Sequence, residues 1–216
     1  MAGSHLVPSA LDRAPDQAPD RAPDQAFDRA RARPPEDAAR WLVEHRHGTS
    51  SAQAQAFFDH LPAVAVDALA GRWHGSGWHT GHPWDGLLEA YGWYGKEFRD
   101  ADDVRPLLFA DRSGHPVPVS PALAPVRLLA RHPGIARSPL PRAGFRVLCP
   151  LLAWPRPTGR LRAVDQRGAV SAALIYDDVP IVDSFRFVAD DLVLGAADIR
   201  GVAPPLFFVL RRSPRP

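Results

Sequence analysis

Short runs of mostly apolar residues, with polar residues interspersed, make up the last quarter of the chain, from residue 160 onward. Runs of this length that are rich in Val, Ile, Leu and Phe are typical of β-strands. Short breaks rich in Gly, Asp and Pro divide the region into five predicted strands, at residues 160–166, 169–176, 181–188, 192–199 and 206–212. Short strands with tight turns indicate an antiparallel meander that closes into a barrel or a sandwich.

A second region, residues 71–110, holds four of the six Trp residues. We interpret it as a strand, a short amphipathic segment and two further strands, at residues 71–79, 83–91, 93–98 and 104–110. On the first strand, Trp73 shares a face with Gly75 and Gly77. An indole can plug one end of a small barrel, and the glycines let the strand bend or let a ligand approach the backbone. The alternative is a glycine-rich edge strand that binds nothing.

The strand at 93–98 carries the only lysine of the chain, Lys96. Strict alternation places Lys96 on one face with Tyr94 and Phe98, and Trp93 on the opposite face.

Together these regions supply about eight strands, so we predict a mainly β fold, an antiparallel barrel whose interior is filled or holds one small ligand. Two helices are expected before it. Pro34 and Pro35 suit the first turn of one helix, Ser50 or Thr49 can cap the other, and the pair lids or flanks the barrel or forms an independent hairpin. The expected segments are a disordered low-complexity tail at 1–34, a helical hairpin at 35–62, the first part of the barrel at 63–112, a Pro-rich loop or cap at 113–159 and the C-terminal meander at 160–216.

Composition narrows the function classes. The formal net charge is +2 and acidic and basic residues are interspersed, so no nucleic-acid partner is expected. Cys149 is the single cysteine, which excludes an internal disulfide. No stretch reaches the roughly 20 apolar residues of a membrane span, so no integral membrane segment is expected and the location we expect is cytoplasmic. The sequence carries no signature of a particular oligomeric state.

Charged residues within apolar strands mark the candidate site. Asp183 and Arg186 lie in such a strand, and Lys96 and Asp198 lie in two others. A buried charge needs a partner, which is either the polar head of a ligand or another charged side chain of the protein. The candidate ligand-binding residues are Trp73, His79, Trp93, Tyr94, Lys96, Tyr176, Asp183, Arg186 and Asp198. We identify no catalytic residue, because neither a Gly-x-Gly-x-x-Gly loop nor a Gly-x-Ser-x-Gly elbow is present.

Two blocks of sequence resemble a known family. The first block is Gly71-Arg72-Trp73-His74-Gly75 with Thr80-Gly81-His82-Pro83 and Tyr94-Gly95-Lys96. It is similar to the bacterial GXWXG-domain family, whose members continue into an uncharacterised C-terminal domain. That companion is matched by residues 179–186, 198–201 and 207–212. The family implies no established activity.

The Gly-x-Trp opening is also similar to that of calycins, which include lipocalins, fatty-acid-binding proteins and haem-binding nitrobindins. In calycins a Trp of the first strand packs under a basic residue of the last, and Trp73 with Arg211 or Arg212 fits that pattern. Analogy with nitrobindins makes His79 and His82 candidate axial ligands of haem; no other cofactor is expected. A three-histidine metal site with His74 is disfavoured, because His74 and His79 fall on opposite faces of a regular strand.

These observations lead to one main hypothesis, which is non-catalytic binding of a small hydrophobic ligand with an acidic or polar head, such as a fatty acid or a phospholipid. In it, Lys96 and Arg186 hold the head. The alternatives are a haem-binding barrel with redox or small-molecule chemistry, and a protein-interaction module that uses the tail and the helices.

Overall fold

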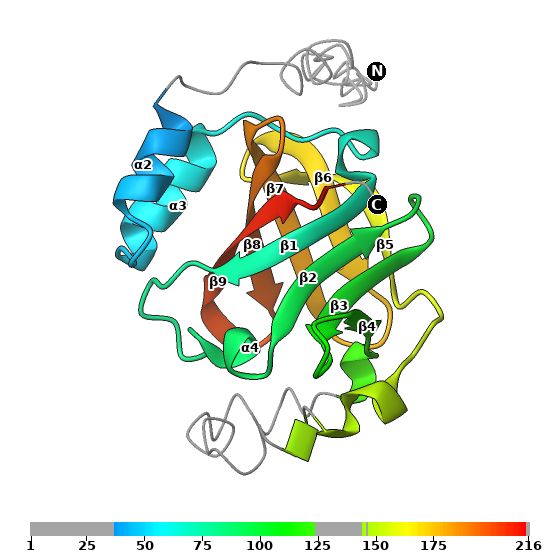
Figure 1. The fold of residues 1–216 in the computed structure, drawn as a ribbon. Helices are drawn as coiled ribbons and strands as arrows, with labels where there is room; N and C mark the ends of the chain where they lie inside the picture. Colours follow the sequence, from blue (N-terminus) through cyan, green and yellow to red (C-terminus); the bar gives the residue numbers. More distant parts are fainter. Residues whose placement is uncertain (1–36, 124–143, 146, 215–216) are drawn as a thin grey trace, which may run out of the picture.

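The computed structural model describes residues 37–123, 144–145 and 147–214 of the 216-residue chain. Within these residues nine strands form one antiparallel sheet in the order β2-β1-β9-β8-β7-β6-β5-β3-β4. An additional pairing of β2 with β3 closes eight of them into a barrel and leaves β4 beside it (Figure 1). The strands are β1 (Gly71–Gly77), β2 (Trp93–Phe98), β3 (Val104–Ala110), β4 (Pro116–Pro118), β5 (Gly159–Gln166), β6 (Ala169–Tyr176), β7 (Ile181–Ala189), β8 (Leu192–Ile199) and β9 (Val202–Arg212). The predicted antiparallel barrel is confirmed.

Two seams join the two halves of the chain. At one seam β1 pairs with β9 over five residue pairs, beginning with Trp73 opposite Arg212. At the other, β3 and β5 share the single pair Val104 opposite Gly159. The hairpin of β5 and β6 therefore continues beyond its junction with β3, and this leaves room at one end of the barrel.

A bulge in β2 changes which side chains point inward. The register of β2 against β3 shifts on both sides of Gly95. Gly95 has φ +145°, and a Cβ there would lie 1.9 Å from the carbonyl oxygen of Trp73. Because of this bulge, Trp93 and Lys96 both face the interior, whereas Tyr94 lies outside with its ring 5.1 Å from that of His74. The prediction that Trp93 and Lys96 face opposite ways is wrong.

Glycines make room for aromatic rings in the barrel interior. A Cβ on Gly75 would lie 2.4 Å from the indole of Trp93, and one on Gly195 would lie 2.2 Å from the ring of Phe208. The space beside Gly75, which we expected to admit a bend or a ligand, thus contains a side chain of the protein. The interior cluster also includes Trp73, Phe98, Leu161, Leu174, Phe185 and Leu210.

Two helices, α2 (Ala38–Glu44) and α3 (Ser51–His60), cover the outer face of the strands on one side (Figure 1). The predicted capping box is present, since Ser50 accepts from the backbone N–H of Gln53 and the Gln53 side chain accepts from that of Ser50. Phe58 of α3 packs edge-on against Phe207 of β9, and Trp78 joins the same cluster. The pair therefore flanks the barrel instead of standing apart from it.

Short elements connect the strands. The segment expected to be helical at 83–91 contains one turn of helix, α4 (Leu87–Ala90), and the turn before β1 is η1 (Asp67–Leu69). In the expected loop at 113–159, the described residues form β4, η2 (Pro121–Leu123) and η3 (Cys149–Leu152). The predicted tail and the loop residues 124–143 lie outside the described residues.

Candidate ligand-binding cavities

The first cavity lies inside the barrel and is called the inner cavity. Its volume is about 100 Å³. Its polar lining is Lys96 of β2, Tyr176 of β6 and Asp183 of β7. The remaining lining side chains are mostly apolar or aromatic: Trp84, Leu87, Leu88, Trp93, Leu107, Pro121, Ile181, Ala197, Ile199, Leu206 and Phe208.

The three polar side chains form one buried network. Lys96 Nζ lies 2.7 Å from Asp183 Oδ2, and the two side chains are 3% and 1% exposed. Lys96 also donates to Tyr176 Oη at 2.9 Å and to the carbonyl of Pro106 at 3.2 Å. Tyr176 Oη donates to Asp183 Oδ2 at 3.0 Å. Lys96 thus makes two hydrogen bonds and one ion pair within the protein.

This network determines which charge the cavity tolerates. Burial raises the pKa of Tyr176 well above its ordinary value, and the neighbouring Asp183 carboxylate adds to the effect. Tyr176 is therefore a neutral hydroxyl at physiological pH. Lys96 and Asp183 neutralise each other, so the inner cavity has no net charge that would attract an acidic head group.

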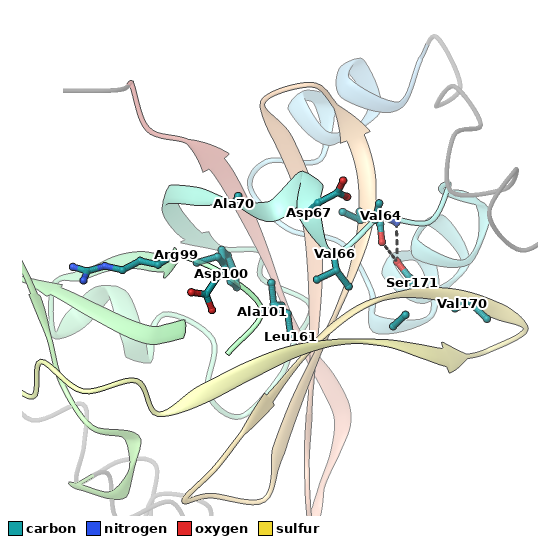
Figure 2. A pocket seen from close by; sticks show the side chains of 13 residues that line it. Val64, Val66, Asp67, Ala70, Arg99, Asp100, Ala101, Leu161, Val170 and Ser171 are labelled. Carbon is teal, nitrogen blue, oxygen red and sulfur yellow. Dashed lines mark hydrogen bonds between the residues drawn. The ribbon is translucent and has the colours of Figure 1, made fainter. Parts of the chain in front are cut away.

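The second cavity, called the outer cavity, lies at the end of the barrel near η1, between the chain before β1, the turn from β2 to β3 and the hairpin of β5 and β6 (Figure 2). It measures about 620 Å³. Phe98, Leu161 and Val64 are its buried apolar residues. Its charged side chains are Asp67, Arg99 and Asp100, and Figure 2 shows that of Arg99 extending away from the other labelled residues. The other lining residues are Ala65, Val66, Ala70, Ala101, Ala163, Val170 and Ser171.

Small side chains and fixed walls explain the outer cavity. Four of its lining residues are alanines, which leave volume that larger side chains would fill. Ser171 Oγ accepts from the N–H of Val64 at 2.8 Å and donates to the carbonyl of Phe185 at 2.6 Å, which ties one wall to the sheet. The backbone N–H of Leu161 donates to the carbonyl of Ala101 at 2.8 Å, which ties the turn after β2 to β5 on the other wall. The cavity is therefore held open by the fold itself.

Four of the nine candidate residues meet at the inner cavity, namely Trp93, Lys96, Tyr176 and Asp183. Trp73 lines neither cavity. Its ring lies 4.2 Å from the guanidinium carbon of Arg212, and its Nε1 donates to the carbonyl of Leu69 at 2.7 Å. Trp73 is thus part of the packed interior.

Arg186 requires a correction. It is buried outside the barrel wall, where its guanidinium carbon lies 4.8 Å from the ring of Phe58. It donates to the carbonyls of Gln166 and Phe185. Arg186 lies three positions after Asp183 in β7, so the two side chains leave opposite faces of the strand. The prediction that Arg186 and Lys96 hold one head group together is therefore wrong.

The other candidates lie away from both cavities. His79 and Asp198 are exposed, and Tyr94 is half-buried beside β9, with its hydroxyl 3.3 Å from Ser213 Oγ. None of the three lines the inner or the outer cavity. Sequence reasoning also missed the outer cavity, because the alanines and valines that surround it have no chemical signature.

The histidines proposed for haem do not reach a cavity that could hold one. His82 is buried, but its Nδ1 accepts from the backbone N–H of Trp84 at 3.0 Å, and it lines neither cavity. Burial lowers the pKa of His82, against the opposing influence of Asp85. In the described part of the chain no three His, Cys, Asp or Glu side chains gather as a metal site would require. His79 and His82 therefore do not fit an axial haem ligand.

Fold and cavities together define a small, closed antiparallel β-barrel with an open apolar cavity at one end and a paired charge inside. The profile described as GXWXG protein matches residues 56–114, and the one described as Domain of unknown function (DUF4334) matches residues 157–212. A solved structure of a protein from Thermomonospora curvata is 31% identical, with a TM-score of 0.62, over 82% of this chain and 99% of that one. The chain belongs to the GXWXG family, with the DUF4334 domain as its C-terminal companion, as its motifs predicted.

No curated protein matches the chain. Among the described residues, no helix combines the length and the apolar character that crossing a membrane requires.

Proposed function

We propose that this protein binds a small, largely apolar molecule in the outer cavity without transforming it. The observation that carries the proposal is an apolar space of about 620 Å³ held open at one end of a closed barrel. Binding sites for small molecules usually measure about 300–1,000 Å³ and are lined mostly by apolar side chains with few polar ones. The outer cavity fits both criteria.

The ligand class we favour is lipid-like, a fatty acid or a related chain with a polar head. The apolar part would rest on Phe98, Leu161 and Val64, and the head would lie at the exposed edge of the cavity, on the side from which Arg99 extends outward. Arg99 is 56% exposed on its side chain and lies 3.2 Å from Glu97, so it provides a hydrated position for a head group. The position of Arg212 over Trp73 supports the resemblance to calycins, which bind ligands of this kind.

Displacement of a fluorescent fatty-acid probe, together with native mass spectrometry, tests this proposal. Ala163→Trp adds a large side chain at an exposed position of β5 that lines the outer cavity, and we expect it to lower the affinity at least tenfold. Ala52→Trp, at an exposed position of α3, is the matched control and should bind as the natural chain does. Equal binding by a folded Ala163→Trp variant, or no binding by the natural chain, would contradict the proposal.

A further inference from the structure

The inner cavity contains buried polar atoms that the protein leaves without partners. Asp183 Oδ1 has no hydrogen-bond partner among the described residues, although Asp183 is only 1% exposed. The same holds for the indole Nε1 of Trp84 and of Trp93. All three side chains line the inner cavity. Buried polar groups in proteins are normally hydrogen-bonded, so these atoms indicate a partner that comes from outside the chain.

The charge of the site restricts this partner to a neutral molecule. The ammonium of Lys96 and the carboxylate of Asp183 are 2.7 Å apart and cancel each other. An anionic ligand would leave the buried site with an uncompensated negative charge, and a cationic ligand would leave it with a positive one. Either excess is strongly unfavourable in a setting this poor in water.

The available atoms restrict the partner further, to a group that both donates and accepts. Lys96 is already engaged by the Asp183 carboxylate, Tyr176 Oη and the carbonyl of Pro106, so the lining atoms without a partner among the described residues are Asp183 Oδ1 and the two indole N–H groups. Asp183 Oδ1 requires a donor, and the indole N–H groups require an acceptor. A hydroxyl satisfies both needs, whereas an ether or a ketone can only accept.

Size and lining describe the remainder of the molecule. About 100 Å³ exceeds the space of a single water and is somewhat smaller than the apolar cavities of about 150 Å³ that take up benzene. Leu87, Leu107, Leu206 and Phe208 surround this space with apolar surface. Leu88 and Ile181 are only half-buried, so the lining reaches the surface.

We infer that the inner cavity is a separate binding site for a small neutral hydroxyl compound, a short alcohol. Its hydroxyl donates to Asp183 Oδ1 and accepts from the indole N–H of Trp84 or Trp93, and its apolar part rests on Phe208 and the surrounding leucines. This site is at a different place from the outer cavity, and it does not depend on the function proposed for that cavity.

The test compares three compounds of similar size, isopropanol, acetone and acetate, titrated by ligand-detected NMR and calorimetry. Isopropanol should bind at least tenfold more tightly than acetone, and acetate should not bind. Equal affinity of isopropanol and acetone, preferred binding of acetate, or no binding of any of the three would overturn the inference. The last result would mean that the space holds water only.

Two further variants connect the preference to these residues. The double variant Lys96→Met with Asp183→Leu replaces the ion pair by apolar side chains of similar size, which preserves folding better than removing one charge. It should lose the preference for isopropanol over acetone, and a preference that survives would overturn the inference. Ala163→Trp, which fills the outer cavity, should leave isopropanol binding unchanged. A natural chain that prefers isopropanol over acetone but binds no fatty acid would contradict the proposed function alone, and one that binds fatty acid without that preference would contradict this inference alone.

Discussion

The two cavities belong to one barrel but are built on opposite principles. The outer cavity is wide and apolar because alanines and valines surround it, and its charged side chains stay at the edge. The inner cavity is narrow, and Lys96 and Asp183 form an ion pair within its lining. The comparison shows that a wide cavity with an apolar lining favours apolar ligands. A buried ion pair instead disfavours charged ligands and offers directed hydrogen bonds.

The largest effect should come from breaking the ion pair of the inner cavity. Lys96→Met leaves Asp183 as an uncompensated buried charge, which typically costs about 3–5 kcal/mol. The double variant with Asp183→Leu should recover most of that loss, since apolar replacement of a whole pair is often close to neutral. Denaturant unfolding of both variants measures the difference. Similar stability of the single and the double variant would show that the pair is not electrostatically coupled.

The bulge that turns Lys96 inward offers the next test. A methyl group at Gly95 would collide with the backbone of Trp73 in a conformation that non-glycine residues rarely adopt. We expect Gly95→Ala to lower the free energy of unfolding by about 2–4 kcal/mol, from overpacking together with backbone strain.

Gly201→Ala provides the control for Gly95→Ala. Gly201 has φ +83° and no atom within 4 Å of its added Cβ, so only strain of about 1 kcal/mol applies. Equal effects of the two substitutions in thermal unfolding would argue against the bulge as a packing requirement.

Some features of the fold and of the cavities could be predicted from the sequence, and others could not. The strands after residue 160 were predicted closely, apart from the start of the last one at residue 202, because short apolar runs separated by turn residues define their limits. That Trp93 and Lys96 face the same side of the sheet was not predicted, because one bulged residue moves every later side chain of the strand to the opposite face. Arg186 was assigned to the ligand because a buried charge suggested one, yet backbone carbonyls and the ring of Phe58 supply its contacts.

The outer cavity escaped prediction for a different reason. It is assembled from four separate segments, and its volume results from the absence of large side chains. No local periodicity encodes such a space. Ala101 could be placed beside Leu161 only by knowing how β3 pairs with β5, and these two strands share a single residue pair.

A smaller effect should separate the charges at the edge of the outer cavity from its apolar interior. Arg99 is exposed and paired with Glu97, so its contribution to an acidic head is that of a surface ion pair, at most about 1 kcal/mol. Arg99→Ala should therefore lower the affinity for decanoic acid by less than about sixfold and leave the affinity for decanol unchanged. Calorimetry with both ligands measures this. An equal loss for the alcohol would place the head group elsewhere.

The smallest effect is the pH dependence of stability that His82 contributes. Burial lowers the pKa of His82, so the unfolded chain takes up that proton more readily than the folded one. The stability contributed by neutral His82 is present above about pH 6.5 and is lost as the pH falls through that value towards the folded pKa. Unfolding curves between pH 7.5 and 5 should show a shallower decline for His82→Gln than for the natural chain. A steeper decline would contradict the assignment.

Amide NMR shifts recorded during a titration with decanoic acid test the central claim most directly. If the outer cavity is the binding site, the shifts should concentrate on residues 64–70, 98–101, 161–163 and 170–171, and should disappear in Ala163→Trp. Shifts confined to other parts of the barrel, or none at saturating ligand, would contradict the claim.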